Sequence, residues 1–339
     1  MRTIEWKDGI VLTVDQLRLP HDFVLLELRS ASEIADAIRS MKVRGAPLIG
    51  AAAAYGLALT AYYSKTKSKE DLLYELEVSA KALRETRPTA VNLSWAIDRV
   101  LNMVKATVGG VDAVAKAVIL EAQRIADEDA EMNYAMGRFG ADLITDGDVI
   151  LTHCNAGAFA TVDYGTALGV IKTAWSQGKK IKVFATETRP QLQGARLTTY
   201  ELQRDGIPVT LITDNMVGFL MYRRMITKVI VGSDRIVRDA VINKIGTYGI
   251  AVLAHEHHIP FYAAAPSSTF DLTHSAKEVV IEERSPDEVT CFSSQRIAPI
   301  GINAFNPAFD ITPFKYVSAI ICEKGVFSPT GFKKLLHIS

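Results

Sequence analysis

Cys154 has the sequence setting of a catalytic residue. It follows the apolar run 149–151 and the polar pair Thr152-His153, and small residues follow it at 156–158. The run predicts a buried parallel strand, and in open α/β sheets the ligand crevice lies outside the carboxyl ends of the strands. A thiol there can transfer a proton or attack as a nucleophile. Since adjacent strand residues point to opposite faces, we do not pair His153 with the thiol and expect it to be structural.

Asp234 lies at the end of a second apolar run, 228–232. A thiol and a carboxylate at two strand ends of one sheet could form an acid/base pair. Farther along, Asn243 and Lys244 stand where we expect a helix to begin. A helix N-terminus with a lysine beside it suits a phosphate or another anion.

Several arginines also precede expected helices. Arg44 and Gly45 stand before a helix that a proline opens, Arg87 precedes a later helix, and the segment 189–196 carries two more arginines and Gln193. Backbone N–H groups at a helix start and a bidentate guanidinium both bind phosphate oxygens. In a chain of zero net charge, this pattern predicts a small phosphorylated substrate.

The composition excludes several classes of protein. The chain has 339 residues, of which 48% are hydrophobic, and its formal net charge is zero. This favours two domains and argues against nucleic acid or a membrane as partner. There is no signal peptide, membrane span, Walker motif or dinucleotide fingerprint. The three cysteines (Cys154, Cys291 and Cys322) have no metal-ligand spacing, so we expect a reduced cytoplasmic protein without a metal, with the last two cysteines structural.

The elements that must position these residues change in character along the chain. Short alternating runs in 1–29 predict two or three antiparallel strands, and 30–143 has helical spacing. Thereafter apolar strands alternate with helices, as in a doubly wound parallel sheet. We expect those strands at 149–153, 181–186, 208–213, 228–232, 260–265 and 278–282. The predicted fold is thus α/β, with an N-terminal strand-and-helix domain (1–145) and a C-terminal Rossmann-like domain (146–339).

The motifs resemble those of the methylthioribose-1-phosphate isomerase family, in the superfamily of the α, β and δ regulatory subunits of translation initiation factor 2B. The resemblance covers about residues 3 to 328, and the motifs occur in the same order as in the family. The motifs that carry it are Val43-Arg-Gly-Ala-Pro, Arg87-Pro-Thr-Ala-Val-Asn-Leu, Thr152-His-Cys-Asn-Ala-Gly-Ala, Glu187-Thr-Arg-Pro, Leu192-Gln-Gly-Ala-Arg, Thr213-Asp-Asn, Gly232-Ser-Asp-Arg-Ile, Asn243-Lys-Ile-Gly-Thr-Tyr and Asn306-Pro-Ala-Phe-Asp.

The resemblance implies an aldose–ketose isomerase of methionine salvage that acts as a homodimer without cofactor or metal. Its substrate would be 5-methylthioribose 1-phosphate and its product 5-methylthioribulose 1-phosphate. Carried over by motif, Cys154 and Asp234 form the catalytic pair. The substrate contacts would be Arg44, Gly45, Ala46, Arg87, Gln193, Asn243 and Lys244.

The substrate's chemistry fits these residue types. Phosphate on the anomeric oxygen means that ring opening needs an acid at the ring oxygen, and a neutral Asp234 could supply that proton. Cys154 would then move a proton between C2 and C1, or both residues would only polarise oxygens during a hydride shift. The loop 236–242 looks one residue shorter than is typical of the family, which puts the substrate in question. The alternatives are ribose-1,5-bisphosphate isomerase and a non-catalytic regulatory subunit.

Overall fold

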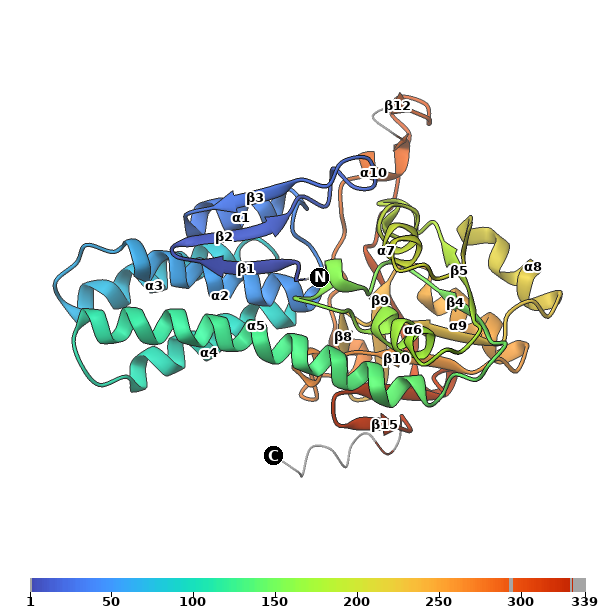
Figure 1. The fold of residues 1–339 in the computed structure, drawn as a ribbon. Coiled ribbons are helices and arrows are strands. Elements are labelled where there is room, and N and C mark those ends of the chain that lie inside the picture. The colour runs from blue at the N-terminus through green and yellow to red at the C-terminus, as the bar shows by residue number, and fades with distance from the viewer. Residues whose placement is uncertain (1, 293–294, 330, 332–339) are drawn as a thin grey trace.

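The computed structural model describes residues 2–292, 295–329 and 331, and it begins with a small sheet beside a helical bundle (Figure 1). The strands form an antiparallel sheet in the order β1-β2-β3, as the alternating runs predict. They span β1 (Ile4–Lys7), β2 (Ile10–Val14) and β3 (Leu25–Leu28). The bundle consists of α1 (Ala31–Arg39), α2 (Ala46–Tyr63), α3 (Lys69–Arg84), α4 (Val91–Ala106) and α5 (Val111–Ala141).

Helix α2 is the centre of the N-terminal core. It is apolar all round and packs against α1, α3, α4 and α5, as expected for a fully buried helix. Pro47 lies in its first turn, and Gly45 caps it with a φ of 108°. A Cβ on Gly45 would lie 2.5 Å from Cα of Ala160, so only glycine allows this contact. The start of α2 is therefore held directly against the C-terminal part of the chain.

The C-terminal part contains the expected parallel sheet, in the order β15-β14-β10-β7-β4-β5-β6. All neighbours are parallel except β14 and β15. Since β4 pairs with β5 on one side and β7 on the other, the strand order reverses there, and a ligand crevice is expected at that point. The strands span β4 (Val149–Thr152), β5 (Lys182–Thr186), β6 (Val209–Ile212), β7 (Lys228–Val231), β10 (Phe261–Ala264), β14 (Ala319–Cys322) and β15 (Gly325–Phe327).

Helices cover both faces of this sheet, which confirms the doubly wound prediction. The end of α5, α6 (Ala167–Ser176) and α7 (Thr199–Arg204) contribute to one buried cluster. On the other face, α8 (Val217–Tyr222) and α9 (Thr247–Glu256) pack in a second cluster.

The prediction of a strand at 278–282 is wrong. Residues 276–278 form a 3-10 turn and the segment that follows is irregular, whereas β14 and β15 extend the sheet. A second antiparallel sheet, which the sequence did not predict, consists of β8 (Arg235–Ile236), β9 (Ala240–Lys244) and β13 (Phe309–Pro313) in the order β13-β9-β8. Beyond it, α10 (Asp287–Thr290) leads into the hairpin β11 (Cys291–Phe292) and β12 (Gln295–Arg296), which projects from the top of the view in Figure 1.

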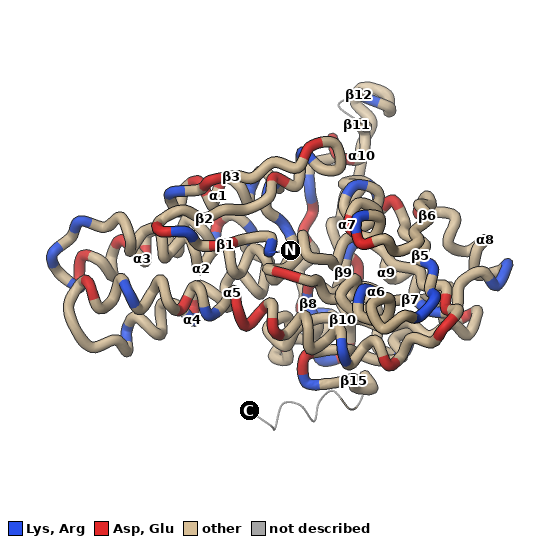
Figure 2. The backbone as a smooth tube through the Cα atoms, viewed as in Figure 1, with Lys and Arg blue, Asp and Glu red and all other residues tan. Residues whose placement is uncertain are grey.

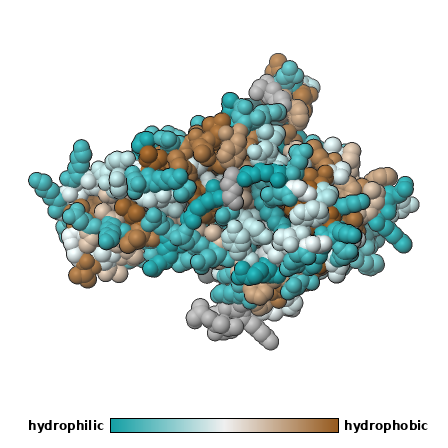
Figure 3. All heavy atoms as spheres, viewed as in Figure 1, coloured by the Kyte–Doolittle hydropathy of each residue, from teal (hydrophilic) through white to brown (hydrophobic). Residues whose placement is uncertain are grey.

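The long helix α5 joins the two parts, because it packs on α2 and α4 and then on α6 and β14. It ends just before the predicted boundary at residue 145, and the division there remains a proposal. In the described part of the chain, no helix is long and apolar enough to cross a membrane. Acidic and basic residues are interspersed over both parts (Figure 2). Figure 3 shows apolar side chains gathered above β3, where Leu17, Phe23 and Leu25 are exposed.

Candidate active site

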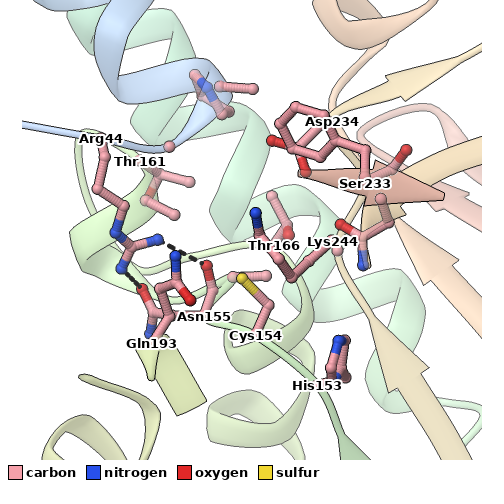
Figure 4. A pocket seen from close by; sticks show the side chains of 18 of the residues that line it. Arg44, His153, Cys154, Asn155, Thr161, Thr166, Gln193, Ser233, Asp234 and Lys244 are labelled. Atoms are coloured by element: carbon pink, nitrogen blue, oxygen red, sulfur yellow. Dashed lines mark hydrogen bonds between the residues drawn. The ribbon is translucent and has the colours of Figure 1, made fainter. Parts of the chain in front are cut away.

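Both candidate catalytic residues and all seven residues that the resemblance assigns to substrate binding line one pocket (Figure 4). The pocket lies where β4 and β7 end and where α2 begins. Figure 4 shows Cys154 between Arg44 and Gln193 on one side and Asp234 and Lys244 on the other. The predicted residues brought together are Arg44, Gly45, Ala46, Arg87, Cys154, Gln193, Asp234, Asn243 and Lys244.

Two threonine hydroxyls hold the backbone of Cys154. Its φ is 63°, in the left-handed region that a non-glycine residue rarely adopts. The Cys154 N–H donates to Oγ1 of Thr188 at 2.9 Å, and Oγ1 of Thr198 donates to the Cys154 carbonyl at 2.6 Å. Both threonines are fully buried. They fix the strained conformation that leaves the thiol on the pocket wall, and nothing in the local sequence signals this role.

His153 is a buried structural residue, as predicted, and does not pair with the thiol. Its Nε2 bonds the carbonyl of Ile245 at 2.8 Å, and its Nδ1 lies 2.6 Å from Oγ1 of Thr186. Because a carbonyl only accepts, Nε2 carries the proton and Nδ1 accepts from the threonine. Burial lowers the pKa of His153, which keeps the ring neutral. The ring thereby ties the end of β4 to the segment that follows β9.

The electrostatics of the pocket favour neutral forms of both candidate catalytic groups. Burial raises the pKa of Asp234, although Lys244 and Arg87 act in the opposite direction. Burial also raises the pKa of Cys154, against the pull of Lys244 and Arg44, so the thiol is protonated at neutral pH. The same desolvation lowers the pKa of Lys244. The arrangement is suited to proton donation from Asp234.

Arg44 is buried and held by Asn155. Nη1 donates to the Asn155 carbonyl at 3.1 Å and Nη2 to the Asn155 side-chain oxygen. The amide nitrogen of Asn155 donates in turn to Glu201 at 2.9 Å, and Glu201 pairs with Lys172 at 3.0 Å. Burial opposes the charge of Glu201, but Lys172 and these hydrogen bonds lower its pKa. Sequence reasoning missed Glu201, because only the fold brings α7 beneath the loop after β4.

The prediction that Asn243 and Lys244 stand at the start of a helix is wrong. Both belong to strand β9, and α9 begins at Thr247. The first N–H groups of that helix are occupied, because Asp310 accepts from N of Gly246 at 2.7 Å and from N of Tyr248 at 3.0 Å. The side chain of Lys244, and not a helix N-terminus, is therefore the cationic group on this side of the pocket.

The prediction that the arginines of segment 189–196 form an anion site is also wrong. Arg189 donates to the backbone carbonyls of Glu288 and Val289, and Arg196 donates to the carbonyl of Gln16 at 2.6 Å. These arginines fasten their segment to neighbouring loops. Only Gln193 from this segment lines the pocket.

A further arginine, Arg284, lines the pocket and was missed by the sequence analysis. Its Nε donates to Glu282 at 2.8 Å, and the other oxygen of Glu282 accepts from Nη2 of Arg87 at 2.9 Å. Thr89 also approaches Glu282, at 3.4 Å. Arg87 is far in sequence from Glu282 and Arg284, and no local sequence motif identifies Arg284 as a pocket residue.

An apolar annex adjoins the pocket and shares Ala46, Arg87, Asp234 and Phe309 with it. Its remaining wall is mostly aliphatic and consists of Ile49, Thr89, Ala90, Arg235, Ile242, Val279, Val280 and Ile281. The loop 236–242, which looks one residue shorter than is typical of the family, is the β8–β9 hairpin. Arg235 and Ile242 of this hairpin line the annex. Among the described residues, no group of His, Cys, Asp and Glu is arranged to hold a metal ion.

Comparison with known proteins places the chain in a family. Residues 42–329 match the initiation factor 2 subunit family, and the chain belongs to it. Within that family its relatives include isomerases of sugar 1-phosphates. The 5-deoxyribose 1-phosphate isomerase of Moorella thermoacetica is 54% identical over 96% of this chain and 94% of its own. The methylthioribose-1-phosphate isomerase of Acetivibrio thermocellus is 51% identical over 97% of each chain.

The structural comparison agrees. The crystal structure of 5-methylthioribose 1-phosphate isomerase from Pyrococcus horikoshii matches this chain with a TM-score of 0.93 and 45% sequence identity. The match covers 100% of this chain and 96% of that one. The N-terminal strand-and-helix part and the doubly wound sheet are thus a fold shared by the two proteins.

Proposed function

We propose that the chain is an aldose–ketose isomerase that converts 5-methylthio-D-ribose 1-phosphate to 5-methylthio-D-ribulose 1-phosphate in methionine salvage. The observation that carries this proposal is the convergence of Cys154 and Asp234 with cationic side chains in one pocket at the reversal of strand order. Relatives about half identical to the chain, over nearly all of its length, bear isomerase names.

The cationic side chains supply the site for the phosphate. Arg44 and Lys244 are buried, and Arg87 is largely so. Glu282 pairs with Arg87, whereas the positive charges buried at Arg44 and Lys244 are costly unless an anion compensates them. Backbone N–H groups at the start of α2, where Gly45 and Ala46 line the pocket, add donors on the same wall. A phosphate held in this way is kept from leaving during ring opening.

Asp234 is the acid for ring opening in this proposal. It donates its proton to the ring oxygen as the bond from that oxygen to C1 breaks. The hydrogen on C2 then moves to C1, and the proton of the C2 hydroxyl passes to the Asp234 carboxylate as the ketone forms, which restores the acid. Two routes fit: Cys154, once deprotonated, accepts the proton from C2 and returns it to C1, or the hydrogen moves directly as a hydride while the neutral thiol polarises an oxygen. The raised pKa of Cys154 favours the second route. No cofactor is required by either route.

The apolar annex supports a substituent without charge at C5. Its mostly aliphatic wall suits a methylthio or methyl group, and its two arginines, Arg87 and Arg235, are already paired with Glu282 and Asp271. This is less favourable to ribose 1,5-bisphosphate. 5-Deoxyribose 1-phosphate is a second candidate substrate, favoured by the relative of that name. A purely regulatory role would not need both Cys154 and Asp234 in one pocket.

Phosphorus and proton NMR of the purified protein with each of the three sugar phosphates tests the proposal. We expect ketose formation from the 5-methylthio substrate without added metal or nucleotide, and its loss in Cys154→Ser and Asp234→Asn. Substrate deuterated at C2 separates the routes: deuterium retained at C1 indicates hydride transfer, and washout indicates proton transfer. Failure to convert any of the three would refute the isomerase assignment. We further propose, on the family resemblance, a cytoplasmic homodimer, which light scattering would test for oligomeric state.

A further inference from the structure

Arg284 lines the pocket and has an unused hydrogen-bond donor. Its side chain is only 10% exposed and lies among the residues that line the pocket. One terminal nitrogen, Nη1, is buried and has no hydrogen-bond partner within the described residues. Most buried polar atoms in proteins are hydrogen-bonded, and an unpaired donor on a guanidinium is unusually costly. Such an atom at a pocket wall points to a missing acceptor.

Glu282 holds Arg284 and Arg87 together. Its two carboxylate oxygens each bind one guanidinium, at 2.8 Å and 2.9 Å. Burial opposes the charge of Glu282, but the two arginines lower its pKa, so the carboxylate remains ionised. The carboxylate cancels only one of the two positive charges. Nε of Arg87 is a second buried nitrogen without a hydrogen-bond partner in the described structure, so the pair retains both charge and donors for an anion.

We propose that Arg284 is a further binding residue for the phosphate on C1 of the substrate, and that Glu282 positions Arg284 and Arg87 to receive it; this inference rests on the proposed function. Arg284 lines the main pocket with Gln193 and Lys244 but does not line the apolar annex. It therefore belongs to the phosphate end, not to the C5 end. A planar guanidinium fixed through Nε keeps its terminal nitrogens available for a phosphate, which a lysine would not reproduce.

The test compares Arg284→Met and Arg284→Lys with a matched surface control, Arg238→Met. Arg238 is about half exposed, pairs with Glu278 and lines neither the pocket nor the annex. We expect Arg284→Met to raise KM for the 5-methylthio substrate roughly ten- to hundredfold, with kcat changed much less, as for the loss of one hydrogen bond to a charged group. Arg284→Lys should recover part of the loss, and Arg238→Met should match the wild type.

Glu282→Gln tests the positioning role. We expect it to raise KM at least as much as Arg284→Met, because it releases two arginines, while kcat changes less. A uniform loss of active protein would lower kcat and leave KM unchanged. An unaltered KM in Glu282→Gln would refute the positioning role.

Calorimetric binding of inorganic phosphate separates this inference from the proposed function. If the wild type turns over none of the sugar phosphates but binds phosphate, and Arg284→Met binds it at least tenfold more weakly, the anion site stands and the isomerase assignment fails. Equal phosphate binding by the two proteins would overturn the inference. So would an effect of Arg284→Met confined to ribose 1,5-bisphosphate, which would place Arg284 at the C5 end.

Discussion

Glu201 supports the candidate site from behind, and replacing it with glutamine should weaken both stability and substrate binding. Its buried carboxylate accepts from the side chain of Asn155 at 2.9 Å and from N of Ala158 at 2.8 Å, and it pairs with Lys172 at 3.0 Å. The loop after β4 thus depends on this one carboxylate. Because Asn155 also orients Arg44, the effect should reach the phosphate end of the pocket.

The expected loss of stability depends on which partners of Glu201 remain satisfied in Glu201→Gln. Breaking a buried ion pair by removing one partner costs about 3–5 kcal/mol. Here Lys172 keeps a second partner, Asp205, at 3.1 Å, so its charge is not stranded. A glutamine amide can also satisfy only part of the donor set that the carboxylate accepts from. We therefore expect a loss of about 3 kcal/mol in the free energy of unfolding and a rise in KM of roughly tenfold.

Urea unfolding at neutral pH measures the first effect and steady-state kinetics the second. Glu27→Gln is the control, because Glu27 forms an exposed pair with Arg29 that should contribute at most about 1 kcal/mol. The folded-state pKa of Glu201 lies below its ordinary value of 4.5, so its contribution is present above that value and is lost as the pH falls through the folded pKa. The difference in the free energy of unfolding between wild type and Glu201→Gln should therefore shrink as the pH falls. A loss below about 1 kcal/mol with an unchanged KM would refute this reasoning.

Three further changes probe the site. Gly45→Ala should lower the free energy of unfolding by roughly 2–4 kcal/mol, because its Cβ would lie 2.5 Å from a backbone atom at a φ of 108°. In Gly178→Ala, at a φ of 84° with open space around it, urea unfolding should show a clearly smaller loss. Asp234→Asn should lower kcat roughly 10²–10⁴-fold while phosphate binding persists. The wild-type rate should also fall as the pH rises through the raised pKa of Asp234. The pH–rate profile of the residual activity of Asp234→Asn should lack this fall. Thr188→Val should lower kcat about tenfold, because it removes the hydroxyl that holds the backbone of Cys154, and Thr188→Ser should restore kcat. Equal kcat values in the two variants would count against this role of Thr188.

Local sequence patterns predicted most of the fold. Helical spacing identified the bundle from α1 to α5, and apolar runs identified β4, β5, β6, β7 and β10. The failures have a common cause. The apolar stretch at 278–282 resembles a strand, but its side chains pack against the hairpin of β8 and β9 in a small cluster of their own. The β13-β9-β8 sheet pairs segments about seventy residues apart, and periodicity within one segment carries no information about such a partner.

The sequence by itself determined the candidate residues of the site, because each stands beside a strand end or a helix start that its own neighbours define. Cys154, Asp234 and Arg44 could be found in this way, whereas Lys244 was selected for a helix start that the structure places at Thr247. Only the tertiary structure decided which of them meet. The order β7-β4-β5 sets Cys154 and Asp234 on adjacent strands, and the contact at Gly45 brings α2 onto them. Arg284 and Glu201 act through charge and hydrogen bonds across long sequence separations, and such interactions exist only once the chain has folded.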